Sequence, residues 1–174
     1  HVWRGNSDRK HGMPRPLHVL FEDNHLLAVN KPADLITMGA PAGKPSLLAM
    51  AKDYIKHKYD KPGNVYLGAM SRLDYPVSGV ILFARTSKAA ARLTDQFRRH
   101  AVEKTYWAIV EGALPKPEGE CIDYLRKDER HRLIKVCRPE DEGAREARLT
   151  YRRLAEVSAG WLLEVQLLTG RKHQ

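Results

Sequence analysis

Short apolar runs separated by turn-forming residues make up most of the chain after residue 17. Residues 19–21 and 25–29 are two such runs; Glu-Asp-Asn lies between them at 22–24, and Asn-Lys-Pro follows at 30–32. A strand needs only about four to eight residues, and turn residues or proline mark its ends. The segment therefore predicts a strand, a turn and a second strand.

Two longer segments have the spacing of helices. In Leu47–Lys58 the apolar positions recur at helical intervals, and Ser46 stands where an N-cap is expected. After Thr-Ser at 86–87, which can cap a helix, Leu93 and Phe97 lie on one helical face. We therefore expect two amphipathic helices.

Five further runs are apolar, or alternate between apolar and polar residues, as strands do. They are Gly79–Ala84, Thr105–Val110, 132–136, 147–154 and 161–168. A loop with Pro115, Pro117 and Gly119 separates the second run from the third, and Ser-Ala-Gly at 158–160 favours a hairpin between the last two. Six or more strands with two helices between them predict an α+β fold, built on a mostly antiparallel sheet with flanking helices.

The length of 174 residues suits one domain, since domains usually have roughly 100–200 residues. Residues 1–17 are basic and lack an apolar period, so we expect a flexible basic N-terminal arm, with 18–174 as the domain. No apolar run approaches the roughly 20 residues that cross a bilayer, and the polar start lacks a signal peptide. We expect a cytoplasmic protein that does not bind a membrane.

The charge favours a polyanionic partner. The chain has 30 Lys and Arg against 21 Asp and Glu, a formal charge of +9. Such an excess attracts phosphate backbones, although a merely solvated surface explains it equally well at this point. Lys88, Arg92 and Arg99 share one face of the second predicted helix and are candidate phosphate contacts. For this row too, a solvated helix surface is the simpler alternative.

Several functional classes lack their sequence signatures. The patterns GxxxxGK[ST], GxGxxG, HExxH and GxSxG are all absent, which disfavours nucleotide hydrolysis, dinucleotide redox chemistry, zincins and serine hydrolases. Cys121 and Cys137 are not a CxxC pair, and no two of the eight histidines have ligand spacing. We expect two ordinary thiols and no metal.

One dense segment, residues 71–79 (Ser-Arg-Leu-Asp-Tyr-Pro-Val-Ser-Gly), comes just before an apolar strand. It places Asp74 two positions after Arg72 in a loop that Pro76 and Gly79 interrupt. Loops on rigid scaffolds often carry catalytic groups. From local chemistry alone, a turn aspartate that binds nearby backbone amides is the more common explanation.

Four blocks in order resemble the motifs of RNA pseudouridine synthases of the RluA/RsuA type. They are LLAVNKP at 26–32, SRLD at 71–74 followed by Ser-Gly at 78–79, EKTY at 103–106 and LLTGRKHQ at 167–174. A single block would be weak evidence, but four blocks in order extend over nearly all of residues 19–174. The resemblance implies the pseudouridine synthase catalytic fold.

The resemblance also implies a function. A pseudouridine synthase isomerises uridine to pseudouridine in structured RNA, ribosomal or transfer, without cofactor or metal, and we expect a monomer. By the same resemblance Asp74 is the catalytic carboxylate, with Arg72 as a candidate for holding its pKa low. Tyr106 offers a ring that stacks on uracil and a phenol that can accept the C5 proton. Arg171 is expected on the substrate face.

Two departures from the family pattern leave an alternative open. Ser71 stands where the family usually has histidine, and the chain stops at Gln174, before the arginine that pairs with the family's catalytic aspartate. We therefore expect a catalytic domain truncated at its C-terminal end. The alternative is a non-catalytic RNA-binding protein that retains the fold. A DNA-binding protein is disfavoured, because no helix-turn-helix or zinc-finger pattern is present.

Overall fold

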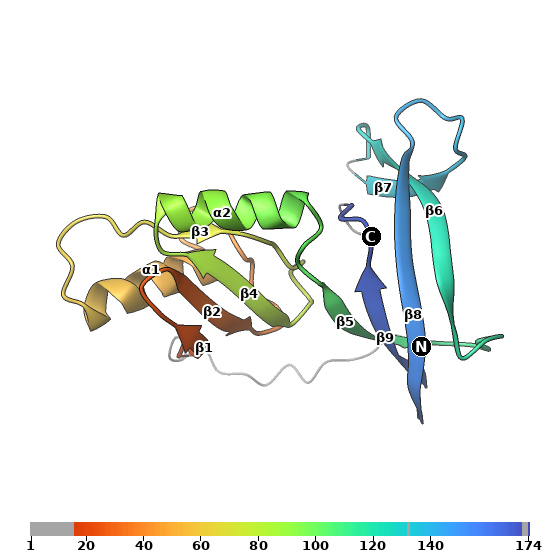
Figure 1. Ribbon diagram of the computed structural model, residues 1–174, viewed down its shortest axis with the longest axis horizontal. Helices are drawn as coiled ribbons and strands as arrows, with labels where there is room; N and C mark the ends of the chain where they lie inside the picture. The colour runs from red at the N-terminus through yellow and green to blue at the C-terminus, as the bar shows by residue number, and fades with distance from the viewer. Residues whose placement is uncertain (1–15, 132, 172–173) are drawn as a thin grey trace. The chain divides into compact units, whose positions relative to one another are not determined.

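The computed structural model describes residues 16–131, 133–171 and 174. The chain divides into two compact units, His1–Thr94 and Asp95–Gln174, which are described in turn. The described residues form two helices and nine strands, so the predicted α+β class is confirmed (Figure 1). Most of the predicted basic arm, residues 1–15, lies outside the described residues, and the assignment of 18–174 to one catalytic domain stays a prediction.

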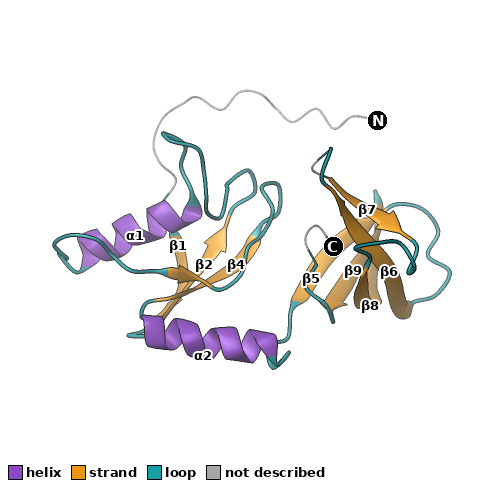
Figure 2. Cartoon of the chain, turned by 90° about the horizontal axis from the view of Figure 1, so that it is seen from above, coloured by secondary structure: helices purple, strands orange, loops and turns teal. Residues whose placement is uncertain are grey.

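The first unit contains a four-stranded antiparallel sheet in the order β1-β2-β4-β3. Its elements are β1 His18–Glu22, β2 Leu26–Lys31, α1 Leu47–Lys58, β3 Gly68–Ala69 and β4 Gly79–Ala84, followed by α2 Ser87–Arg98. The central pair, β2 and β4, is in register from Leu26 opposite Ala84 to Lys31 opposite Gly79. Figure 2 shows α1 and α2 on opposite sides of this sheet.

Alternating residues of β2 and β4 form the core of the first unit. Leu27 and Val29 on β2 lie directly opposite Phe83 and Ile81 on β4, and all four are fully buried. They cluster with three buried residues of α1, namely Leu47, Ala51 and Ile55. Each large side chain buried in this way contributes about 1.5–3 kcal/mol to folding. The apolar spacing that predicted α1 is therefore the surface that fixes it to the sheet.

Both helix starts are capped as predicted. The Ser46 hydroxyl accepts a hydrogen bond from the Ala49 amide at 3.2 Å, and the Thr86 hydroxyl accepts one from Ala89 at 3.1 Å. These bonds satisfy amides that have no partner within the first helical turn.

The second unit contains a five-stranded antiparallel sheet in the order β5-β9-β8-β6-β7. Its strands are β5 Thr105–Val110, β6 Glu118–Asp128, β7 Leu133–Cys137, β8 Arg145–Val157 and β9 Gly160–Leu167. The hairpin predicted at 158–160 joins β8 to β9, with Val157 opposite Gly160. A side chain at Gly160 would lie 2.0 Å from the Val110 carbonyl oxygen, so only glycine fits there.

The strands differ from the prediction in three ways. They form two sheets, whereas one was expected, because a sequence pattern marks strands without naming their partners. Strands β3 and β6 were not predicted, and Gly119, which was expected in a loop, lies in β6. Strand β6 was not predicted from the sequence because most of its residues are exposed and many are charged. Pairing with β8 on one side and β7 on the other holds it in place.

Three further properties of the described residues bear on function. None of their helices is both long and apolar enough to span a bilayer. Cys121 is exposed, Cys137 is half-buried, and both are free thiols as expected. No group of three His, Cys, Asp or Glu side chains within the described part of the chain is arranged to hold a metal ion.

Candidate active site

Asp74 lies in the exposed loop between β3 and β4. The Asp74 carbonyl accepts a hydrogen bond from the Val77 amide at 3.1 Å, which closes a turn directly after the carboxylate. Arg72, Asp74 and Tyr75 are all exposed. The loop therefore presents its acidic and basic side chains at the surface of the first unit.

Two buried side chains hold the residues on either side of Asp74. On one side, the Thr37 hydroxyl donates to the Leu73 carbonyl at 2.9 Å and accepts from the Leu73 amide at 3.3 Å. On the other, the Lys31 ammonium donates to the Tyr75 carbonyl at 3.2 Å, and the Asp34 amide donates to the same oxygen at 2.9 Å. The backbone is thus fixed immediately before and after Asp74, while the Asp74 side chain is exposed.

Lys31 also shapes the electrostatics of the loop. Its fully buried Nζ donates to the carbonyl oxygens of Leu35 at 2.8 Å and Pro32 at 3.0 Å. Burial lowers the pKa of the Lys31 ammonium, and the carboxylates of Asp34 and Asp74 oppose that shift. A buried positive charge therefore acts on the Asp74 carboxylate.

Lys31 was predicted only as part of the LLAVNKP block, with no role of its own. A signal was present, because Lys31 follows Leu27 and Val29 at alternating positions that a strand turns to the core. A lysine is almost never fully buried unless it is paired or hydrogen-bonded. A lysine on the same strand face as two core residues was thus a sign that its ammonium forms hydrogen bonds inside the protein.

Tyr106 lies on β5 in the second unit. Tyr106, Ala108 and Val110 point to one side of the strand and are half-buried, whereas Trp107 and Ile109 point to the other and are 74% and 61% exposed. Burial raises the pKa of the Tyr106 phenol, so it stays protonated at neutral pH. The ring can stack on a base, and the hydroxyl can donate a hydrogen bond.

Arg171 follows the end of β9. Its Nε donates to the Glu146 carbonyl at 2.7 Å, and its backbone amide donates to the Gln174 side-chain oxygen at 3.0 Å. Arg72 and Asp74 thus belong to one loop of the first unit, while Tyr106 and Arg171 belong to the second unit. Each pair is held by its own unit.

The basic row on α2 is not uniform. Lys88 and Arg92 are exposed, and neither forms an ion pair with a described carboxylate. Arg99 lies one residue beyond the helix and pairs with Asp95 at 2.6 Å, and Asp95 also pairs with Arg98 at 2.6 Å. The two helical members of the row are therefore more available to a phosphate than Arg99.

The order of the motifs and the anchored Asp74 loop agree with a match to a known family. A family model described as RNA pseudouridylate synthase matches residues 25–174. The chain belongs to this family. The match includes the anchored Asp74 loop, Tyr106 and Arg171.

Curated relatives of the family support the assignment. The chain is 31% identical over 169 residues to tRNA pseudouridine synthase C of Vibrio cholerae. The aligned region covers 91% of this chain and 66% of the relative. It is 34% identical over 161 residues to ribosomal large subunit pseudouridine synthase D of Zymomonas mobilis. Here the aligned region covers 91% of this chain and 50% of the relative. The chain thus spans between half and two thirds of these pseudouridine synthases.

A solved structure supports the fold. Human RNA pseudouridylate synthase domain containing 4 superposes with a TM-score of 0.75 at 23% sequence identity, over 90% of this chain and 61% of that one. At this identity the likeness establishes the pseudouridine synthase fold alone.

Proposed function

We propose that this protein is an RNA pseudouridine synthase that converts uridine to pseudouridine in transfer or ribosomal RNA, with Asp74 as the catalytic carboxylate. Family membership supports the reaction, and the names of the two bacterial relatives support the substrate class. One observation carries the assignment of Asp74. Its backbone is fixed on both sides by Thr37 and Lys31, while its side chain faces solvent.

The reaction is an isomerisation, so it needs no net donor or acceptor. The bond between C1′ and N1 of uridine breaks, the uracil turns, a bond forms between C1′ and C5, and the C5 proton moves to solvent as N1 gains one. An ionised Asp74 can act as nucleophile or stabilise the separated fragments, and the buried Lys31 ammonium supplies a positive charge that acts on this carboxylate. We assign Tyr106 to stacking, because its raised pKa makes a phenolate base at C5 unfavourable.

The target base must leave its stack to reach a carboxylate on a protein loop. We assign the contacts with phosphate to basic side chains on the two units, mainly Lys88 and Arg92 and to a smaller extent Arg99, which pairs with Asp95, with Arg72 next to the base. We further propose that the enzyme acts in the cytoplasm, as a monomer and without metal or organic cofactor. The RNA classes in the names of the two bacterial relatives support the cytoplasmic setting.

One observation favours a second function, a non-catalytic RNA-binding protein. Ser71 replaces a histidine that the family motif usually has directly before Arg72. A protein that bound RNA without modifying it would need neither that histidine nor an ionised Asp74. The two functions differ in turnover and agree in RNA binding.

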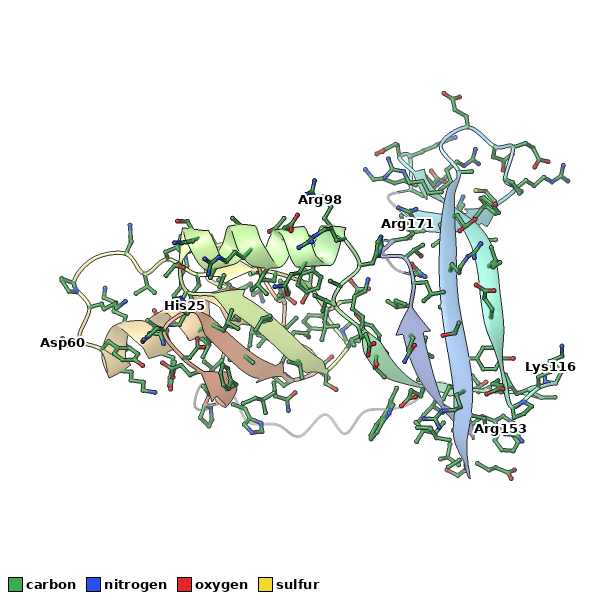
Figure 3. The ribbon with its side chains drawn as sticks, viewed as in Figure 1. His25, Asp60, Arg98, Lys116, Arg153 and Arg171 are labelled. Atoms are coloured by element: carbon green, nitrogen blue, oxygen red, sulfur yellow. The ribbon has the colours of Figure 1, made fainter. Side chains whose placement is uncertain are left out.

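Release of tritium from RNA that carries uridine labelled at C5 tests the proposal. The wild-type protein is expected to release tritium from total tRNA or rRNA, and Asp74→Asn to lower the rate by roughly a thousand-fold or more while RNA affinity stays within about two-fold. Asp60→Asn is the matched control, because Asp60 is an exposed aspartate in the loop after α1 (Figure 3). Wild-type protein that releases no tritium, or full release by Asp74→Asn, would contradict the proposal.

A further inference from the structure

Lys104 lies on the same side of its strand as Tyr106. The Lys104 carbonyl accepts a hydrogen bond from the Leu167 amide at 3.2 Å, so the β5–β9 ladder continues one residue before β5 begins. Side chains two residues apart in a strand point to one face, and Glu103 therefore points to the other. The half-buried Lys104 side chain thus shares a sheet face with the residue assigned to stack on uracil.

Gly170 brings the Lys104 ammonium beside the segment that carries Arg171. A methyl group built on the Gly170 Cα would lie 3.6 Å from Lys104 Nζ, so the ammonium lies against the backbone of the residue directly before Arg171. The Lys104 ammonium therefore lies next to the residue that precedes Arg171 in the chain, at one end of the five-stranded sheet. Neither Lys104 nor Arg171 forms an ion pair with a carboxylate of a described residue.

Among the described residues, the Arg171 guanidinium is held through one of its three nitrogens. Its Nε donates to the Glu146 carbonyl at 2.7 Å, which fixes the guanidinium plane and leaves the two Nη groups for a ligand. Two carboxylates of the sheet, those of Glu146 and Glu120, lie within ion-pair distance of the Arg148 Nε, at 3.3 Å and 3.4 Å. The positive charge of Arg171 is thus not neutralised by these carboxylates.

The Gln174 carboxamide closes the turn that holds Arg171. Its Oε1 accepts from the Thr169 hydroxyl at 2.8 Å and from the Arg171 amide at 3.0 Å, and its Nε2 donates to the Arg148 carbonyl at 3.1 Å. The Thr169 hydroxyl in turn accepts from the Arg148 amide at 2.8 Å. The turn is therefore tied to β8 through hydrogen bonds that Thr169 and Gln174 supply.

We propose that Lys104 and Arg171 form a phosphate-binding site for the RNA backbone, and that Thr169 and Gln174 are the positioning residues that orient Arg171. The site takes a phosphodiester next to the nucleotide that stacks on Tyr106. A planar guanidinium and a flexible ammonium suit the oxygens of one phosphate group. The choice of nucleotide rests on the proposed function, whereas binding of the phosphate does not.

The site is tested by equilibrium binding of a fluorescein-labelled tRNA mixture to the full chain at several salt concentrations. Lys104→Ala and Arg171→Ala are each expected to weaken binding about five- to twenty-fold at low salt and to reduce the salt slope by about one. Lys116→Ala is the matched control, because Lys116 is an exposed lysine in the loop after β5, at the other end of the sheet (Figure 3). Equal affinities and slopes for all three variants would overturn the proposal.

The positioning role is tested by a double-mutant cycle. Thr169→Val removes the hydroxyl at nearly constant volume and is expected to weaken tRNA binding several-fold, whereas Thr169→Ser restores it. In the Arg171→Ala background, Thr169→Val is expected to have almost no further effect, because it acts through Arg171. An equal loss in both backgrounds would show that Thr169 supports the sheet generally and would overturn the positioning role.

The test of the phosphate site can succeed or fail independently of the proposed function, because RNA binding is measured without catalytic turnover. Folding of each variant is checked by its thermal midpoint, and the conservative Arg171→Lys is a second probe if Arg171→Ala fails to fold. Arg171→Lys keeps the charge without the guanidinium plane and is expected to recover part of the affinity. If wild-type protein releases no tritium from RNA but Arg171→Ala still lowers affinity and slope, the phosphate site stands and the enzyme assignment falls.

Discussion

The two sheets bury their side chains very differently. In the first unit, ten hydrophobic residues from β2, β4, α1 and the loops between them form one buried cluster. In the second unit, Ala147 and Leu163 are the buried hydrophobic residues among those described. Large apolar side chains of the second sheet lie at the surface instead, with Trp107 74% and Val136 69% exposed.

The difference shows that the two candidate site regions are held by different forces. The Asp74 loop sits on a close-packed core, and the buried Lys31 and Thr37 anchor it from inside. The Arg171 turn sits on a strand ladder, where each hydrogen bond contributes about 0.5–1.5 kcal/mol net. The proposed carboxylate thus lies on a loop held by buried side chains, whereas the proposed phosphate contact lies on a turn held mainly by hydrogen bonds at the end of a sheet.

The largest effect that this comparison predicts is on the free energy of unfolding. Phe83→Ala removes a fully buried ring from the first core and is expected to cost about 3–5 kcal/mol, because the cavity cannot be refilled without moving the sheet. Trp107→Ala removes an even larger ring from the second sheet and is expected to cost less than about 1 kcal/mol, because that ring is mostly in water already.

Urea unfolding of both variants, followed by circular dichroism, measures the two costs. Equal costs for Phe83→Ala and Trp107→Ala would contradict the comparison, because they would mean that Trp107 is covered in solution.

An effect of intermediate size concerns the polar cluster around Glu22 in the first unit. The largely buried Glu22 carboxylate pairs with Lys58 at 2.7 Å and Arg85 at 2.9 Å, and it accepts hydrogen bonds from Tyr54 and Tyr59 at 2.8 Å and 2.6 Å. Glu22→Gln is expected to cost about 2–4 kcal/mol at neutral pH, because Arg85 is left buried beside a neutral amide. Glu129→Gln, which breaks an exposed pair with Lys127, is expected to cost less than about 0.5 kcal/mol.

The pH dependence of the unfolding free energy separates the contribution of the Glu22 charge from the contribution of its packing. Burial opposes its ionisation, yet hydrogen bonds from Lys58, Tyr59 and Tyr54 lower its pKa from 4.5 to about 2. The unfolded chain therefore binds the proton first, and the stabilisation is complete above about pH 4.5 and lost as the pH falls toward 2. The difference in unfolding free energy between wild type and Glu22→Gln should shrink over that window. If the difference stays constant as the pH falls, the stability that Glu22→Gln loses comes from packing and not from charge.

The fold was predictable where local pattern and tertiary burial agree. The bounds expected for Leu47–Lys58, Gly79–Ala84 and Thr105–Val110 are those of α1, β4 and β5. In α1 the same residues give the periodic pattern, the cap and the core contacts. Strand β6 has no such agreement, because its pairing with β7 and β8 decides its conformation and its exposed, charged residues do not alternate clearly.

The candidate site was predictable from motif resemblance and much less from local chemistry. Asp74 alone was compatible with an ordinary turn, and Tyr106 with a core aromatic. The partners of the anchoring residues could not be found from spacing, since Lys31 reaches Tyr75 across 44 positions and Gln174 reaches Arg148 across 26. Only the folded chain brings such partners together. Roles for the individual residues remain predictions that the variants test.

The smallest expected effect concerns α2, which begins in the first unit and ends in the second. Arg92→Ala is expected to weaken tRNA binding about three- to ten-fold at low salt and to lower the salt slope by about one, because no described carboxylate offsets its charge. Arg99→Ala should change affinity less than about two-fold, because Asp95 already pairs with Arg99. Both substitutions are exposed and should leave the thermal midpoint nearly unchanged.

Asp95→Asn sharpens this last contrast. It removes the carboxylate that Arg98 and Arg99 share, so it should raise affinity for the tRNA mixture about two- to three-fold and steepen the salt slope. Arg99→Ala should then have a larger effect in the Asp95→Asn background than in wild type, because the freed guanidinium can reach a phosphate. If Asp95→Asn leaves affinity unchanged and Arg92→Ala does the same, the basic row is a solvated helix surface and RNA binds elsewhere.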